Sequence, residues 1–301
     1  MAYALQIVIA RKLLKPFYES SGAFNQMVQD LPLGEQDYNR EAIQEDEMRK
    51  IALVLGLVLL AGNAFGTPST TYWTPMVMDI QGYKVPHLGI DNYFASTNKS
   101  RTEDIDRGVG NGSFPTDVGL TMGVLPFEKI QMEIGIDALY PSEHPYFFNA
   151  KLGAPENALF QGAPALQVGI FNVGTTKDVT DQNIVYAVIG KTIPGVGRLS
   201  AGPYSGNSKL LVNTKGEKEN TGFMVAFDRG FLPAKDTAGN EYNKWVFAAD
   251  YASGENAFGG GGAGIYYYLT KDISLLTGPV WFNDKAVNGA WKWTTQLDIN
   301  F

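Results

Sequence analysis

The sequence has no cysteine and only two histidines, and 18% of its 301 residues are charged. Without cysteine, the chain forms no disulfide bonds and offers no thiol nucleophile or thiolate metal ligand. Two histidines leave few candidates for general-base catalysis or for a metal site. The formal net charge is −7, and no basic patch is large enough for nucleic-acid binding. We therefore predict no nucleic-acid partner, no cofactor, no metal and no enzymatic activity.

The most apolar stretch, residues 51–61, is shorter than the roughly 20 residues that a membrane-spanning helix needs. It follows Arg49 and Lys50, and small residues follow it up to Gly66. This order of basic, apolar and small residues is typical of a secretory signal peptide. We predict a signal peptide at 48–66 that is cleaved on export.

Residues 1–47 precede this segment, although a signal peptide belongs at the start of a precursor. The string QEDE at 44–47 stands directly before Met48. Glu and Asp codons are purine-rich, as a ribosome-binding site would be. We predict that translation starts at Met48 and that 1–47 is a misassigned N-terminal extension, which N-terminal sequencing of the precursor would test.

What the chain has in abundance is short segments in which apolar and polar residues alternate. In the segment 130–138, Glu133 and Asp137 alternate with isoleucine and methionine. Alternation with a period of two indicates β-strands whose two faces differ. An unpaired charge in a dry core costs several kcal/mol, so acidic residues at these positions favour a barrel with a wet lumen over a two-sheet sandwich. Abundant glycine (34 residues), tyrosine (15) and phenylalanine (17) also suit a membrane barrel.

The last fourteen residues, 288–301, alternate most regularly and end on an aromatic residue. One side of this predicted strand carries Trp291, Trp293, Leu297, Ile299 and Phe301. The pattern resembles the closing strand of Gram-negative outer-membrane β-barrels, in which a terminal Phe and alternate apolar residues are the signal read by the barrel-assembly machinery. The resemblance implies two partners, outer-membrane lipid and that machinery. It leaves the oligomeric state open.

Twelve segments with this alternation lie between residue 87 and the C-terminus. We predict an all-β fold, an antiparallel transmembrane β-barrel of about 12 strands (range 10–14) over 87–301. Connections alternate between short (125–128, 193–195 and 270–272) and long (97–113, 207–219 and 253–261), as expected for such a barrel. The connection 230–243 does not fit this alternation, because its place in the order predicts a short turn and the interval is long. Residues 67–86 could be a periplasmic lead, a first short strand or a segment folded into the lumen.

The predicted lumen face carries most of the charged residues within the strands. Its acidic members are Asp91, Asp117, Glu133, Asp137, Asp228, Asp250 and Asp298, and its basic members are Lys151, Lys191, Arg198 and Lys292. Rings of acidic groups favour cations in a pore. We therefore predict a porin-like channel for passive diffusion of small solutes, biased toward cations. The alternative is that these charges pair across the lumen, close it and hold the strand register.

Two other functions remain open on the sequence. A closed barrel could serve as a structural or docking protein whose loops 97–113 and 207–219 meet a partner. A barrel-embedded hydrolase would need a nucleophile and a base, and Ser142 and His144 lie close together with Asn149 as a third member. The order of these residues is reversed from that of the twelve-stranded outer-membrane phospholipase, and prolines flank the loop.

Overall fold

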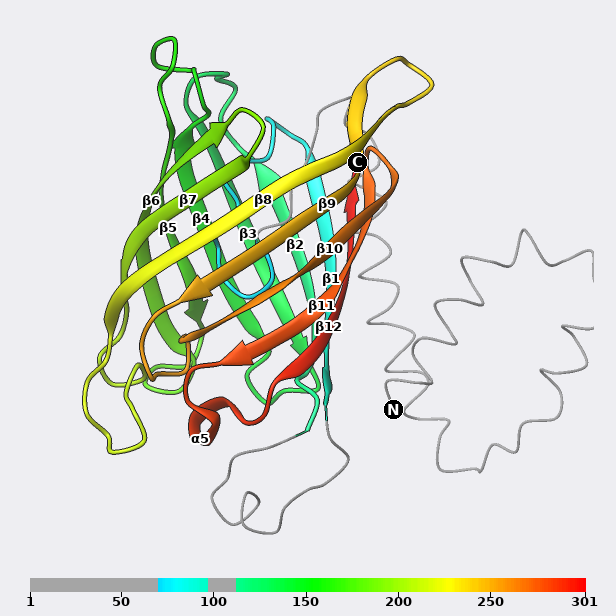
Figure 1. The fold of residues 1–301 in the computed structure, drawn as a ribbon. Coiled ribbons are helices and arrows are strands. Elements are labelled where there is room, and N and C mark those ends of the chain that lie inside the picture. The colour runs from blue at the N-terminus through cyan, green and yellow to red at the C-terminus, as the bar shows by residue number, and fades with distance from the viewer. Residues whose placement is uncertain (1–69, 97–111) are drawn as a thin grey trace, which may run out of the picture. The chain divides into compact units, whose positions relative to one another are not determined.

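The computed structural model describes residues 70–96 and 112–301, and the predictions for 1–47 and 48–66 concern residues outside this part. Within it the chain forms twelve β-strands and one short helix, α5 (Lys285–Asn288) (Figure 1). No helix in the described ranges is long and apolar enough to cross a membrane. The strands are β1 (Pro86–Ala95), β2 (Thr116–Gly123), β3 (Gln131–Tyr140), β4 (Tyr146–Ala154), β5 (Ala165–Gly174), β6 (Asp181–Ile193), β7 (Gly197–Ser205), β8 (Thr221–Lys235), β9 (Glu241–Ala252), β10 (Gly260–Thr270), β11 (Ile273–Phe282) and β12 (Lys292–Asn300).

The strands form a single closed antiparallel barrel. Each strand pairs with its neighbours in sequence, and β12 closes the sheet on β1. In the closing pair His87 lies opposite Asn300 and Ala95 lies opposite Lys292. Closure leaves no sheet edge unpaired, which is the condition for strands to cross a bilayer. The predicted fold class and the count of twelve strands are confirmed.

Side-chain alternation separates the two surfaces of the barrel. On β3, Glu133 and Asp137 are 4% and 7% exposed, whereas Ile134 between them is 45% exposed. On β12, Lys292 is buried and Trp293 is exposed. Exposed apolar side chains cover the outer face of every strand, among them Phe94, Met122, Phe148, Val168, Val185, Leu199, Phe223, Phe247, Ile265 and Leu275. An outer surface of this kind requires an apolar surrounding.

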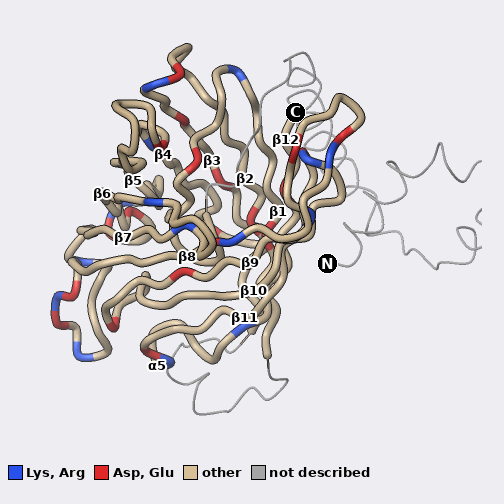
Figure 2. The backbone as a smooth tube through the Cα atoms, turned by 45° about the horizontal axis from the view of Figure 1, so that its top comes forward, with Lys and Arg blue, Asp and Glu red and all other residues tan. Residues whose placement is uncertain are grey.

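The two ends of the barrel differ in their connections. Pro86 and Asn300 lie at one end, the termini end, together with the connections 124–130, 155–164, 194–196, 236–240 and 271–272. The opposite end, the loop end, carries α5 and the connections 141–145, 175–180, 206–220, 253–259 and 283–291. Charged residues gather on the 206–220 loop (Figure 2).

The connection predicted at 230–243 is a long hairpin with a short turn. β8 continues to Lys235 and β9 begins at Glu241, so the turn is only 236–240. Asp236 Oδ1 accepts hydrogen bonds from the backbone N of Ala238 (2.9 Å) and Asn240 (2.8 Å). The side-chain hydrogen bond from Asn240 lowers the pKa of Asp236. The long interval therefore reflects extended strands rather than a long loop.

Residues 70–85, named here the lumen segment, run along the inside of the barrel, and all of them except Asp79, Tyr83 and Lys84 are buried or half-buried (Figure 1). Tyr72, Met76 and Met78 are at most 3% exposed. Met76 and Met78 belong to a core cluster with Ile184, Tyr186, Val188, Tyr204, Leu211, Met224 and Phe258. The buried residues of this stretch therefore pack against the inner side of the barrel wall.

The barrel interior is therefore partly apolar, which differs from a lumen lined by charge alone. Leu276, Val280 and Phe282 of β11 face inward and pack in a second cluster around Tyr72. The reason is that the lumen segment replaces water along this part of the wall, and apolar contacts with it are favourable. The wet-lumen prediction was wrong for this side of the barrel.

Candidate functional site in the barrel lumen

Asp250 on β9 holds the first part of the lumen segment. Its Oδ2 accepts hydrogen bonds from the backbone N of Tyr72 (3.3 Å), Trp73 (2.9 Å) and Thr74 (2.6 Å), and from the Thr74 hydroxyl (2.7 Å). Its Oδ1 accepts from the backbone N of Gly262 at 3.1 Å. Hydrogen bonds to an ionised acceptor are about twice as strong as neutral ones. A single buried carboxylate thus satisfies three successive backbone donors of the lumen segment.

A buried ion pair holds the last part of the lumen segment. Glu133 and Lys151 are opposite each other on β3 and β4, and Lys151 Nζ lies 3.1 Å from Glu133 Oε1. Lys151 Nζ also donates to the carbonyl oxygens of Val77 (3.1 Å) and Asp79 (3.0 Å). Glu133 Oε2 accepts from the backbone N of Gln81 at 2.7 Å. Besides their contact with each other, both members of the pair therefore form hydrogen bonds with the lumen segment.

Arg198 makes the third attachment, near the termini end. Its guanidinium donates two hydrogen bonds to Asp79, at 2.9 and 2.7 Å, and Nε donates to Asp228 Oδ2 at 2.8 Å. The planar fork of arginine suits such bidentate contacts with carboxylates. Five of the predicted lumen residues, Glu133, Lys151, Arg198, Asp228 and Asp250, thus bind or support the lumen segment.

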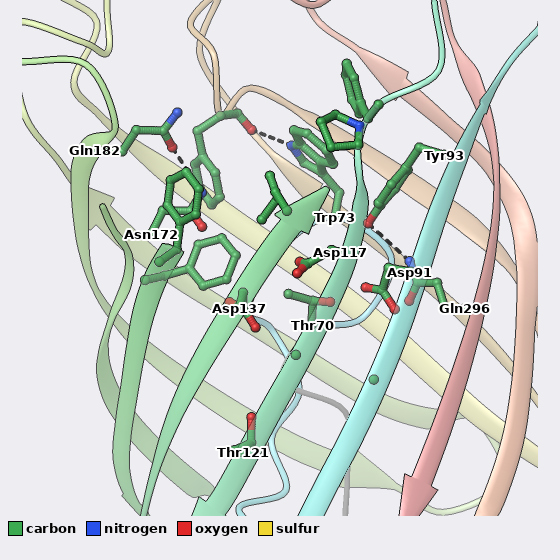
Figure 3. A pocket seen from close by; sticks show the side chains of 18 of the residues that line it. Thr70, Trp73, Asp91, Tyr93, Asp117, Thr121, Asp137, Asn172, Gln182 and Gln296 are labelled. Atoms are coloured by element: carbon green, nitrogen blue, oxygen red, sulfur yellow. Dashed lines mark hydrogen bonds between the residues drawn. The ribbon is translucent and has the colours of Figure 1, made fainter. Parts of the chain in front are cut away.

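A cavity of about 280 Å³ remains beside the lumen segment, against the part of the wall formed by β12 and β1 to β6 (Figure 3). Four aspartates line it: Asp91, Asp117, Asp137 and Asp298. Asp298 Oδ1 lies 3.3 Å from His87 Nε2, and the Asn149 amide donates to Asp137. Asp91 and Asp117 are directly opposite each other in the β1–β2 register. Figure 3 shows Asp91, Asp117 and Asp137 pointing toward the same space.

Aromatic rings form much of the rest of the cavity wall. The lining rings are Trp73, Tyr93, Phe114, Phe147, Phe171 and Phe258. Trp73 meets Tyr93 edge to face at 5.9 Å between centroids, and its Nε1 donates to the Phe258 carbonyl at 2.8 Å. Tyr93 in turn donates its hydroxyl to the Tyr72 carbonyl at 3.0 Å. These contacts fix the position of the rings against the lumen segment.

Lys191 does not belong to the lumen face, and this prediction was wrong. It shares the outward side of β6 with Val185 and Ile189, which are 55% and 50% exposed. Its Nζ lies 2.7 Å from Glu156 in the adjacent turn, and that hydrogen bond lowers the pKa of Glu156. Both faces of β6 are apolar over much of its length, so the sequence pattern could not distinguish them.

Lys292 faces the lumen as predicted but has no carboxylate partner among the described residues. Its Nζ donates to the Gly112 carbonyl at 2.8 Å and lies 4.3 Å from the centroid of the Phe114 ring. A cation over an aromatic face is attracted by the quadrupole of the ring. Lys292 therefore contacts the Phe114 ring of the cavity wall but does not itself line the cavity.

The residues of the hydrolase alternative do not form a triad. The Ser142 hydroxyl accepts from the backbone N of His144 at 3.1 Å, and the His144 ring contacts the Thr176 hydroxyl at 3.1 Å. Asn149 instead contacts Asp137 and the backbone N of Asn172. The predicted third member thus serves a different part of the molecule.

Neither His87 nor the residues of the lumen segment to which the wall side chains bind were selected from the sequence. His87 is 3% exposed and its Nδ1 lies 2.8 Å from Asn300 Oδ1. Because His87 shares its alternation with Asp91, the pattern of β1 could have placed it inside. The lumen segment gives no such signal, since its backbone, rather than a periodic set of side chains, makes most of its polar contacts.

The predicted assembly signal lies on the outer surface, at the seam of the barrel. Trp291 and Trp293 are 45% and 44% exposed, and Leu297 and Ile299 share their side of β12. The backbone N of Phe301 donates to the Pro86 carbonyl at 3.1 Å. Recognition of this strand by the assembly machinery stays a prediction.

A closed antiparallel barrel with lipid-compatible side chains outside and most of its charged strand residues inside is the architecture of porin-like outer-membrane β-barrels. The described residues have the fold of this class of protein. No protein-family model matches the chain, and no curated protein matches it.

Several solved structures resemble the chain. The COG4313 outer membrane channel from Pseudomonas putida F1 is 9% identical, with 80% of this chain and 99% of that chain covered and a TM-score of 0.39. The NanC porin is 6% identical, with coverages of 71% and 98% and a TM-score of 0.39. A Rh. blastica porin mutant is 10% identical, with coverages of 79% and 66% and a TM-score of 0.36. At these values the likeness assigns neither a family nor a solute.

Proposed function

We propose that the protein is an outer-membrane channel for small solutes whose conduction is limited by the lumen segment. The observation that carries this proposal is a barrel interior that is occupied yet not fully packed. The lumen segment is held by three polar attachments, at Asp250, at the Glu133–Lys151 pair and at Arg198, and a cavity of about 280 Å³ lies beside it. A protein whose interior served packing alone would not need that cavity, because closed cores contain few voids larger than water.

The expected ion preference is for cations. Four aspartates line the cavity, and neither lysine nor arginine is among its described lining residues. Acidic groups along a pore attract cations and repel anions. The three shortest connections of the termini end (194–196, 236–240 and 271–272) and the long 206–220 loop at the other end support an orientation with the termini in the periplasm.

Planar-bilayer recording of the folded protein tests this function. The wild-type protein should show small conductance steps, and a potassium chloride gradient should give a reversal potential of the sign that cation preference predicts. The variant Arg198→Ala should conduct more, because it releases Asp79 near one mouth of the lumen. Preference for anions would contradict the cation bias. Absence of conductance from both proteins would contradict the channel function.

The filled interior also supports the second candidate, a closed barrel that acts through its loops. Met76, Met78 and Tyr72 pack tightly against the wall on one side of the lumen. Under this alternative, neither wild type nor Arg198→Ala conducts, and shortening the loop 207–219 abolishes binding of a partner while the barrel still folds. Shortening the loop 97–113 would be the second deletion to test in the same way.

A further inference from the structure

The cavity beside the lumen segment has a strongly unbalanced charge. Its described lining includes four aspartates and one histidine but no lysine or arginine. Asp298 is close to His87, and Asp137 accepts a hydrogen bond from Asn149. Asp117 Oδ1 is buried and accepts no hydrogen bond from the described residues. Burying an acceptor of this kind is unfavourable unless something binds it.

The register of the barrel wall concentrates this charge. Asp91 and Asp117 are direct cross-strand partners, and like charges in that arrangement destabilise a sheet. The neighbouring pair on the same face is Gly89 opposite Gly119. A Cβ at Gly119 would come within 2.7 Å of Asp137 Oδ1, and one at Gly89 would meet His87 Nε2 at 3.6 Å. The two glycines thus keep open the space between the carboxylates.

The remaining wall is suited to a ligand with an apolar body. Six aromatic side chains line the cavity, and Trp73, Tyr93 and Phe114 lie in mutual ring contact. Aromatic faces attract ammonium groups, most strongly where water is excluded. No group of His, Asp and Glu side chains in the described ranges has an arrangement that could hold a metal ion. Aromatic walls and carboxylates together therefore favour an organic cation over a bare metal ion.

We propose that this cavity binds a compact organic cation, an ammonium group attached to a small aromatic or alkyl body. The carboxylates of Asp91 and Asp117 contact the ammonium group, and the rings around Trp73 and Phe114 contact the body. The volume of about 280 Å³ lies near the lower limit of small-molecule pockets, roughly 300 Å³, which sets the size. This inference rests on the proposed channel function for its biological meaning, but binding is measurable without conduction.

Isothermal titration calorimetry of the folded protein in detergent micelles tests the proposal, with benzylamine as the probe. We expect saturable binding of benzylamine and none of benzyl alcohol, its neutral analogue of similar shape. Asp117→Asn should weaken binding about tenfold or more, the loss expected for one charge-assisted hydrogen bond. Gly89→Ala keeps every charge but narrows the cavity, and it should also weaken binding. Glu143→Gln, an equal charge change on an exposed loop, should leave binding unchanged.

Thermal stability separates a binding role from a structural one. Asp117→Asn removes repulsion from Asp91, so it should raise the melting temperature of the ligand-free barrel while lowering affinity. Weaker binding together with a lower melting temperature would overturn the proposal, as would equal binding of benzyl alcohol. Should this variant not fold, Asp91→Asn and Gly89→Ala provide the same test of affinity.

The outcomes also distinguish this inference from the channel function. Conduction of potassium by a protein that does not bind benzylamine overturns the binding proposal alone. Saturable benzylamine binding by a protein that does not conduct overturns the channel alone.

Discussion

The same substitution, Asp to Asn, should have opposite effects on stability at two lumen positions. Asp250 accepts five hydrogen bonds, four of them from the lumen segment. In Asp250→Asn, one carboxylate oxygen becomes an NH₂ group that faces a donor, and the remaining bonds lose their charge. Hydrogen bonds to charged groups contribute about 1.5–3 kcal/mol each and neutral ones about half as much, so we expect a loss of about 2–4 kcal/mol.

Asp117→Asn should instead stabilise the barrel slightly. Its Oδ1 has no hydrogen-bond partner among the described residues, and the change removes repulsion from Asp91, which is worth about 0.2–1 kcal/mol for directly opposed residues. The free energy of unfolding can be measured by guanidinium titration of each variant in phospholipid vesicles, with tryptophan fluorescence as the signal. Because both positions lie on the lumen face, general effects of charge removal cancel in the comparison.

Two results would refute this reasoning. Equal destabilisation by both substitutions would mean that lumen charge stabilises the barrel regardless of its partners. A loss below about 1 kcal/mol in Asp250→Asn would mean that Asp250 does not hold the lumen segment in the folded protein, since that is the net worth of one ordinary hydrogen bond.

Three further predictions concern the outer surface. Ile134→Arg places a charge on the lipid-facing side of β3 and should cost about 2–4 kcal/mol in vesicle unfolding; a loss near zero would argue against lipid contact there. Lys191→Gln should leave the reversal potential in a salt gradient unchanged, because this side chain pairs with Glu156 outside the lumen; a shift would contradict its outward position. Deletion of Phe301 should reduce the amount of barrel assembled in cells while refolding into detergent in vitro stays normal, as judged by heat-dependent gel mobility; equal loss in both assays would indicate a structural role instead.

Local alternation carried most of the information about the fold. On β3 and β12 polar and apolar residues alternate over most of each strand, so the strands and their buried charges could be assigned from neighbours in the sequence. On β6 both faces carry apolar residues, and there the face of Lys191 was assigned wrongly. The full length of the β8–β9 hairpin was also not predicted, because Gly230 and Pro233 interrupt the alternation of apolar and polar residues within a strand that continues to Lys235.

Only part of the candidate site could be predicted from the sequence. Asp91, Asp117 and Asp137 were recognised as lumen residues, since inward direction depends on the period of the strand alone. Their grouping in one cavity depends on register, which sets Asp91 opposite Asp117 and brings the adjacent strand alongside. Register is a relation between strands, and a single strand pattern does not contain it.

By itself, the sequence determined that the chain forms twelve amphipathic strands and which side of most of them carries charge, because both properties repeat every two residues. Only the tertiary structure decided that residues 70–85 enter the barrel, that Asp250 and Arg198 hold them there, and that a cavity remains beside them. Those outcomes depend on contacts such as the one between Thr74 and Asp250, which are 176 residues apart. Contacts at that separation follow from barrel closure, and no local pattern encodes them.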